Sequence, residues 1–193
     1  MADNYLENKM EEYRSTNSSK KAMHRPVYGV RPDTVVLPYP MKKVVIMGAD
    51  TPQGEIAVRT FRKADCRVAF CGNDMRHGTR LAQNSGGQFY PIHEEDELKS
   101  VLERIRANIG EEDVIVVCNA AYVEALQDII CRNIIVVSHD ENSVSVDALI
   151  STKTHINNII VSGEKWATAL SNLCLLLTMP GSEVINGQCI HIG

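Results

Sequence analysis

The sequence lacks any long hydrophobic run, although 44% of its 193 residues are hydrophobic. No apolar segment reaches the roughly 18 residues that a membrane-spanning helix needs. Residues 1–20 are polar and lack the apolar core of a signal peptide. We therefore expect a cytoplasmic protein with no membrane partner, and its length predicts a single core rather than two ordinary domains.

Basic clusters are also missing. The chain has 20 Lys and Arg against 24 Asp and Glu, a net charge of −4, and its longest basic runs are Lys20-Lys21 and Lys42-Lys43. Proteins that bind nucleic acid attract the phosphate backbone with a clustered positive field. The charge pattern therefore predicts that nucleic acid is not a partner.

Metal-ligand and disulfide spacings are absent as well. The six cysteines form no C-x-x-C pair, and most lie in apolar runs where a small hydrophobic side chain would fit. The six histidines show no H-E-x-x-H spacing. We expect reduced, buried thiols and no metal site.

Residues 1–40 differ in composition from the rest of the chain. Polar residues dominate, and four prolines between Pro26 and Pro40 favour an extended segment. Two interpretations stay open for this N-terminal arm: a partly disordered tail, or an arm that packs on a neighbouring subunit. Residues 41–193 form the predicted folded domain.

From Lys42 onward, short β-branched runs alternate with helical patterns. This alternation is typical of βαβ units, and it predicts an α/β fold in which a doubly wound parallel sheet of about seven strands has helices on both faces. The predicted strands are 43–47, 67–71, 88–92, 114–118, 134–138, 156–161 and 189–192. Apolar spacings of three and four residues predict helices over 98–109 and 165–177, and both stripes are explained by core packing.

The most informative stretch is residues 44–57, where a buried strand passes through a turn into a helix. Gly48 and Gly54 are six residues apart, as are the first and last glycines of dinucleotide-binding turns. The middle glycine is replaced, because Thr51 or Pro52 stands there. Glu55 follows Gly54 where a nucleoside triphosphate loop needs Lys. We expect the pyrophosphate of NAD or NADP to bind over Gly48, Thr51, Pro52, Gln53 and Gly54.

The end of the second strand carries the residues that would select the cofactor. An acidic residue there binds the ribose of NAD, whereas Arg accepts the phosphate of NADP. The sequence offers Asn73 and then Asp74, slightly late. Asp74 is as well explained as the N-cap of the next helix, and that interpretation is the favoured one. The choice between NAD and NADP stays open.

These residues resemble the short-chain dehydrogenase/reductase family, a Rossmann-fold family. Met47-Gly48 and Gly54 are similar to its T-G-x-x-x-G-x-G turn, and Asn119-Ala120 to its N-N-A-G motif. Three later motifs have the right order, namely Ser138-His139 for its Ser-Ser pair, Asn158 with Gly163, and 187–193 for its closing segment. The resemblance covers most of residues 42–193. It implies an NAD(P)-dependent oxidoreductase in which Asn119 and Ala120 flank the cofactor.

The family's catalytic Y-x-x-x-K segment has no counterpart. Only residues 140–155 separate the strands that should flank it, and they contain no Tyr. Two matches occur elsewhere, Tyr5 with Lys9 and Tyr39 with Lys43, and chance explains both. The resemblance therefore implies a degenerate active site without the Tyr that moves the substrate proton and the Lys that lowers its pKa.

His139 is the best remaining acid or base, because it stands at the carboxyl end of a parallel strand, and Ser138 precedes it. A surface loop residue is the competing interpretation for this histidine. Three functions remain: an oxidoreductase with an altered proton donor, a non-catalytic module that senses dinucleotide, and an oligomeric scaffold. The substrate is not specified by the sequence.

The last strand and the helix before it predict self-association. A strand over 189–192 would be a sheet edge, and edges of sheets are usually covered or paired. The resemblance adds that the corresponding helix and strand pair across a twofold axis. We expect a homo-oligomer, a dimer or larger, built from Lys165–Leu177 and Cys189–Ile192.

Overall fold

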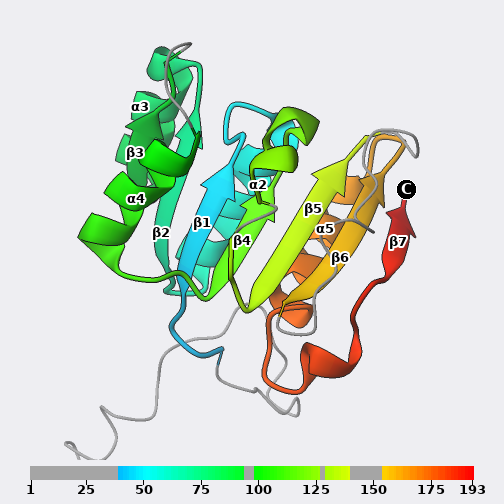
Figure 1. The fold of residues 1–193 in the computed structure, drawn as a ribbon. Helices are drawn as coiled ribbons and strands as arrows, with labels where there is room; N and C mark the ends of the chain where they lie inside the picture. Colours follow the sequence, from blue (N-terminus) through cyan, green and yellow to red (C-terminus); the bar gives the residue numbers. More distant parts are fainter. Residues whose placement is uncertain (1–38, 94–97, 127–128, 140–153) are drawn as a thin grey trace, which may run out of the picture. The chain divides into compact units, whose positions relative to one another are not determined.

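The computed structural model describes residues 39–93, 98–126, 129–139 and 154–193. Within these ranges the chain forms a seven-stranded sheet in the order β3-β2-β1-β4-β5-β6-β7, with every neighbouring pair parallel (Figure 1). The strands are β1 (Lys43–Met47), β2 (Arg67–Gly72), β3 (Gln88–Pro91), β4 (Val114–Val117), β5 (Asn133–Ser138), β6 (His155–Val161) and β7 (Cys189–Ile192).

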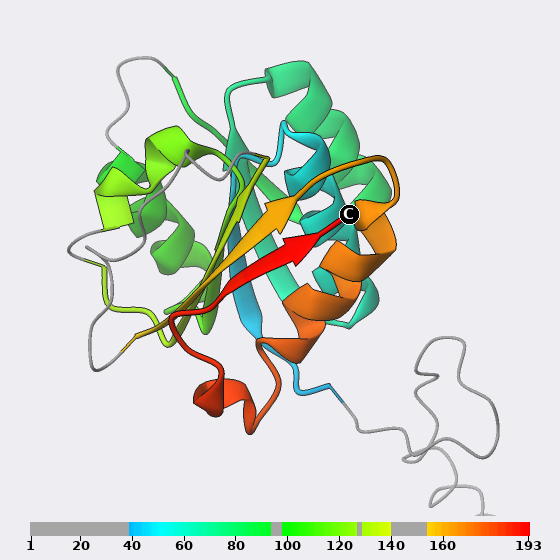
Figure 2. The same cartoon turned by 90° about the vertical axis from the view of Figure 1, so that its right-hand side faces the viewer.

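Helices cover both faces of this sheet (Figure 2). One face carries α2 (Pro52–Lys63), α3 (Met75–Ser85) and α5 (Trp166–Leu176). The other carries α4 (Leu98–Ile109) and the short helices η1 (Ala120–Tyr122) and η2 (Glu124–Leu126), and a further short helix, η4 (Ser182–Val184), precedes β7. The predicted doubly wound, Rossmann-type α/β sheet is therefore confirmed.

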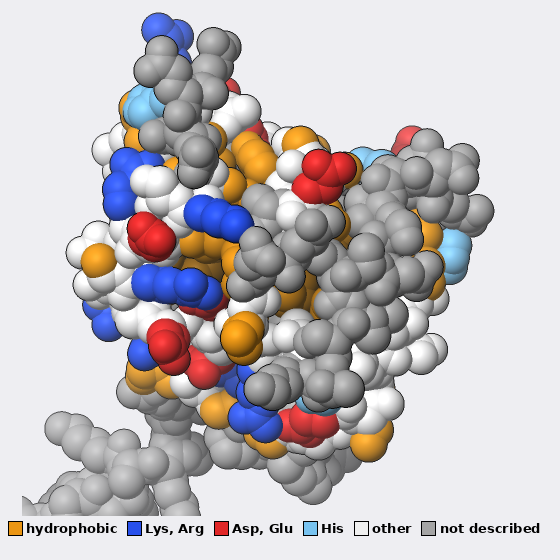
Figure 3. Space-filling view, viewed as in Figure 1, with side chains coloured by type: hydrophobic (Ala, Val, Ile, Leu, Met, Phe, Trp, Pro, Cys, Tyr) orange, Lys and Arg blue, Asp and Glu red, His pale blue; other side chains and the backbone are white. Residues whose placement is uncertain are grey.

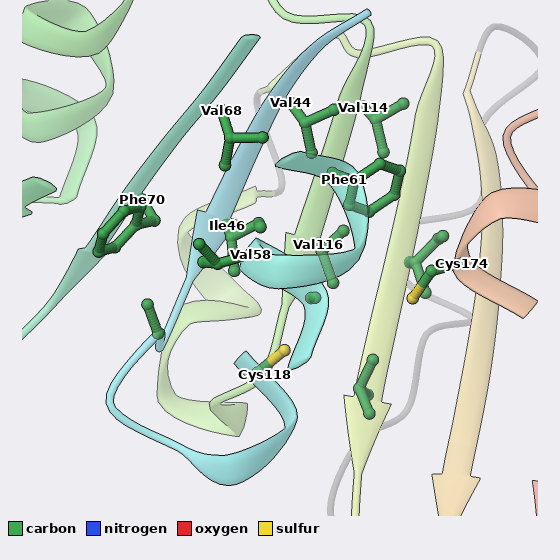
Figure 4. Close-up of a cluster of buried hydrophobic side chains, with 14 of the residues drawn as sticks. Val44, Ile46, Val58, Phe61, Val68, Phe70, Val114, Val116, Cys118 and Cys174 are labelled. Atoms are coloured by element: carbon green, nitrogen blue, oxygen red, sulfur yellow. The ribbon is translucent and has the colours of Figure 1, made fainter. Parts of the chain in front are cut away.

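The core consists of two layers, one on each side of the sheet. Successive residues of a strand point to opposite faces, so Val44 and Ile46 of β1 pack with Phe61 of α2 (Figure 4). Val45 and Met47 belong to the opposite layer, which includes α4. Burial on both sides explains why the central strands read as continuous apolar runs rather than as alternating patterns.

The predicted elements differ from the observed ones only at their ends. β2 includes Gly72, whereas β3 and β4 each end one residue before the predicted limit. β5 and β6 begin one residue earlier, because the backbones of Asn133 and His155 join the ladder. Their polar side chains hide this extension from a hydrophobic pattern.

Tyr39 and Lys42 fix the start of β1 against the end of α5. The Tyr39 hydroxyl forms a hydrogen bond with the Thr178 hydroxyl, and the Lys42 amine donates to the Thr178 carbonyl. Burial raises the pKa of Tyr39. These contacts lie at the amino end of β1, opposite the edge where such sheets bind ligands, so Tyr39 has a structural role. Residues 1–38, with the match of Tyr5 and Lys9, lie outside the described residues.

Five of the six cysteines are buried, and the sixth, Cys189, is exposed on β7. Burial raises the pKa of Cys71, Cys131 and Cys174 to about 12, so these side chains stay protonated thiols. In the part of the chain that the structure describes, no three His, Cys, Asp or Glu side chains gather as a metal site would require. No helix in that part is long and apolar enough to cross a membrane.

Candidate functional site

The turn after β1 is fixed by the neighbouring strands on both sides. Gly48 has φ +82°, in the left-handed region that favours glycine. Its amide and that of Ala49 both donate to the Cys71 carbonyl of β2, at 3.0 Å each. A Cβ at Gly48 would stand 3.0 Å from the Asn119 Cβ, just past β4. The turn therefore lies at the point where the strand order reverses between β1 and β4.

Gly54 lets α2 pack directly on this turn. A Cβ at Gly54 would stand 2.2 Å from the Gly48 carbonyl oxygen and 2.7 Å from the Ala49 Cα. Both neighbours are backbone atoms of the turn, so a side chain would force the helix or the turn to move. The close approach explains the requirement for glycine at this position, six residues after Gly48.

Thr51 caps the helix that starts here. Its hydroxyl oxygen accepts from the Gly54 amide at 3.1 Å and donates to the Gly48 carbonyl at 2.7 Å. The Glu55 amide donates to the Thr51 carbonyl, and Pro52 has no amide hydrogen. An anion that binds the Gly54 amide therefore has to displace the Thr51 hydroxyl.

Two carboxylates lie in the turns after β1 and β2. Asp74 accepts from the amides of Arg76 and His77, both at 2.9 Å, and these bonds lower the pKa of its carboxyl. Asp74 is thus the N-cap of α3, as the favoured interpretation predicted. Asp50 Oδ2 accepts from the Asn73 amide at 3.1 Å, whereas its buried Oδ1 has no hydrogen-bond partner.

Tyr122 connects the loop after β4 with the loop after β2. Its hydroxyl donates to Asn73 Oδ1 at 3.1 Å. Burial, followed by the nearby charge of Asp50, raises the pKa of Tyr122 to about 12. The hydroxyl is therefore protonated at neutral pH and donates the hydrogen bond to Asn73.

The remaining predicted site residues lie along the same edge of the sheet. Asn119 caps η1 by accepting from the Ala121 amide at 3.0 Å, and Ala120 is exposed. Ser138 is buried at the end of β5. His139 is exposed, and its ring meets that of Trp166 edge-on, with 5.9 Å between the centroids. β5 is two strands from β1, a separation of about 10 Å across the sheet.

The structure brings the predicted residues of the turn and of β4 into contact, but it holds His139 against the start of α5. It also shows three residues that the motifs missed: Asp50, Tyr122 and Trp166. Asp50 lies between the two glycines, yet spacing alone gives no sign that its side chain reaches the end of β2. Trp166 belongs to the apolar stripe of 165–177, which core packing explains, and no sequence motif includes Tyr122.

The surface around α4 carries both signs of charge. Figure 3 shows Lys and Arg side chains lying among Asp and Glu on this face. One pair has a buried carboxylate: Arg106 donates to both oxygens of Glu112, at 2.9 and 2.5 Å, and the Glu112 side chain is 1% exposed whereas that of Arg106 is 35% exposed. This pair joins α4 to the segment before β4, so Arg106 and Glu112 have a structural role.

Together these features define a Rossmann-type α/β domain with a glycine turn at its switch point. No protein-family model matches the chain, and neither does any curated protein. Among solved structures, BdcA from E. coli aligns at 18% identity with a TM-score of 0.53, over 78% of this chain and 96% of that one. A second BdcA structure, in complex with NADPH, aligns at 15% identity with a TM-score of 0.54, over 78% and 92%.

A short-chain dehydrogenase/reductase from Serratia marcescens aligns at 12% identity with a TM-score of 0.57, over 81% of this chain and 98% of that one. The fold is not confined to that family, because ribose-5-phosphate isomerase from Brucella melitensis aligns at 12% identity with a TM-score of 0.62, over 80% and 91%. At these identities the likeness shows a shared fold. The short-chain dehydrogenase-like fold implied by the sequence motifs is therefore present.

Proposed function

We propose that this protein binds a nicotinamide dinucleotide, NAD or NADP, as a short-chain dehydrogenase-like protein without standard Tyr and Lys catalysis. The observation that carries the proposal is the turn from Gly48 to Gly54 at the switch point of the sheet. Ligands of open α/β sheets bind at the carboxyl edge where the strand order reverses. The NADPH complex of BdcA, which shares this fold, supports the class of ligand.

The residues at this edge fit the proposed ligand. Gly48 and Gly54 keep side chains away from the turn, where the pyrophosphate would lie. Asn119 and Ala120 follow β4 and would flank the ribose and nicotinamide. The buried, unpartnered Oδ1 of Asp50 offers an acceptor to a hydroxyl group at the end of β2. When bound, the nicotinamide would supply a hydride.

Acid and base groups are scarce at the same edge. No Tyr occurs between Ser138 and Ile156, so the family's proton donor has no counterpart there. General acid–base catalysis commonly contributes about 10²–10⁴ in rate. His139 carries the imidazole of the predicted site, and its edge-on contact with Trp166 holds the ring at the end of β5. We infer that turnover, if the protein retains it, depends on His139.

The first prediction separates binding from catalysis. NADH or NADPH titrated into the protein should show a saturable change in cofactor fluorescence, because the glycine turn is intact. A panel of aldehydes, ketones and sugar carbonyls should show turnover far below that of an ordinary short-chain dehydrogenase. The His139→Ala variant should bind cofactor as the wild type does and should lose whatever turnover remains.

Each outcome of this experiment selects one function. Residual turnover that vanishes in His139→Ala supports an oxidoreductase with an altered donor. Binding without turnover supports a dinucleotide-sensing module. Absence of binding to either cofactor overturns the proposal and favours the oligomeric scaffold, an alternative that the Thr51 cap on the Gly54 amide supports. Robust turnover that survives the His139→Ala change would show that the chemistry lies elsewhere.

We also propose that the chain forms a homodimer or larger assembly through α5 and β7. β7 is the outermost strand of the described sheet, and Leu176 on α5 is 50% exposed. An outermost strand beside an exposed apolar side chain favours association with a second copy. Sedimentation at micromolar concentration should show a dimer or larger species, and Leu176→Glu should shift it toward monomer.

Met75→Glu is the matched control for this prediction. Met75 is 49% exposed but lies on α3, beyond the opposite end of the sheet from β7. The control should leave the assembly unchanged. A monomeric wild type, or an equal effect of both substitutions, would contradict the proposed interface.

A further inference from the structure

We propose that Asp50 is the acidic group that receives the adenosine ribose, and that it makes the site prefer NAD over NADP. This inference rests on the proposed dinucleotide function and deepens it. In dinucleotide-binding sheets an acidic residue after the second strand accepts hydrogen bonds from the ribose hydroxyls. Here the carboxylate reaches that place from the turn after β1 instead.

The position of Asp50 is fixed by β2. Its Oδ2 accepts from the Asn73 amide at 3.1 Å, directly after the strand. Gly72 makes room for it, since a Cβ at Gly72 would stand 3.1 Å from both Cγ and Oδ1 of Asp50. The carboxylate therefore lies against the last residue of β2, where the ribose-binding acid of such sheets belongs.

The two other polar side chains at this place are already engaged. Oδ1 of Asp74 accepts hydrogen bonds from the amides of Arg76 and His77, so this carboxylate is part of the start of α3. Asn73 Oδ1 accepts from the Tyr122 hydroxyl. Asp50 Oδ1, by contrast, is buried and has no hydrogen-bond partner. A buried carboxylate oxygen without a donor is costly, and a ribose hydroxyl would satisfy it.

The same carboxylate disfavours NADP. That cofactor carries a phosphate on the ribose 2′ oxygen, so its charge would lie beside the negative charge of Asp50. The competing cation is Arg76, at the start of α3, which would favour the phosphate if its charge dominated. Oδ1 of Asp50 is buried, so neighbouring side chains have to shift before a ligand reaches it. A substitution at Asp50 should therefore change the affinity for cofactor more than a substitution at the exposed Asp74.

The test measures the dissociation constants of NADH and NADPH for the wild type, Asp50→Asn and Asp74→Asn. The wild type should bind NADH at least about tenfold more tightly than NADPH. Asp50→Asn keeps an acceptor for the Asn73 amide but loses the charge, so the preference should fall to within about threefold, mainly through tighter NADPH binding. Asp74→Asn is the matched control, because Asn is an equally good N-cap, and it should keep the wild-type preference.

A second probe needs no variant and guards against a misfolded Asp50→Asn. ADP-ribose should compete with NADH at least about tenfold better than 2′-phospho-ADP-ribose does on the wild-type protein. Equal or tighter binding of the 2′-phosphorylated ligands, or a preference that changes with Asp74→Asn and not with Asp50→Asn, overturns the inference while leaving dinucleotide binding intact. If neither NADH nor NADPH binds, the proposed function itself fails.

Discussion

Replacing Arg106 with Ala should lower the free energy of unfolding by about 3 kcal/mol. Glu112 is 1% exposed at its side chain, and Arg106 donates to both of its oxygens. The pair also raises the pKa of the Arg106 guanidinium, chiefly through the hydrogen bonds to Glu112. Without Arg106 the folded protein would contain a buried carboxylate with no counter-charge, which is far more costly than the loss of a surface ion pair.

Urea unfolding at neutral pH measures this effect, and a double variant identifies its cause. Arg106→Ala/Glu112→Ala should be more stable than Arg106→Ala alone, because neither charge remains. A loss in the double variant that equals the sum of the losses in the two single variants would mean that the arginine acts only through its packing.

Replacing Gly54 with Ala should destabilise the protein by about 2 kcal/mol and abolish dinucleotide binding. Ala is the better residue within a helix by about 1 kcal/mol, so intrinsic propensity alone predicts the opposite sign. The added methyl group would stand 2.2 Å from the Gly48 carbonyl oxygen, and this backbone atom cannot move without displacing the turn. The larger Gly54→Val change should have the same direction and a greater effect.

Gly78 supplies the matched control, since it also lies within a helix and its added Cβ would also stand 2.2 Å from a neighbour. That neighbour is the Phe89 ring, which can rotate away. Gly78→Ala should therefore cost less stability than Gly54→Ala and should leave NADH binding unchanged. If Gly54→Ala folds and binds NADH with wild-type affinity, the proposed position of the pyrophosphate is wrong.

The architecture of the described part of residues 42–193 follows from its sequence pattern. Seven β-branched runs with helical spacings between them predict a parallel sheet covered on both faces, because only a strand buried on both sides can be apolar throughout. The glycine pair 48 and 54 also predicted the close-packed turn that the structure has between β1 and α2, where the strand order reverses. These signals are local: they depend on periodicity and on residues that are almost unique in their backbone freedom.

Only the fold shows which carboxylate lies at the end of β2. Asp74 comes slightly late in the sequence for a ribose-binding acid and caps α3, as its position predicted, whereas Asp50 lies at the end of β2. The register of β1 beside β2 sets this arrangement, because it brings the turn after one strand against the last residue of the other. The Tyr122 hydroxyl donates to Asn73 Oδ1 across the turns. This contact and the bond between Asp50 and the Asn73 amide join residues 49 and 23 positions apart in the chain, so no pattern along the sequence contains them.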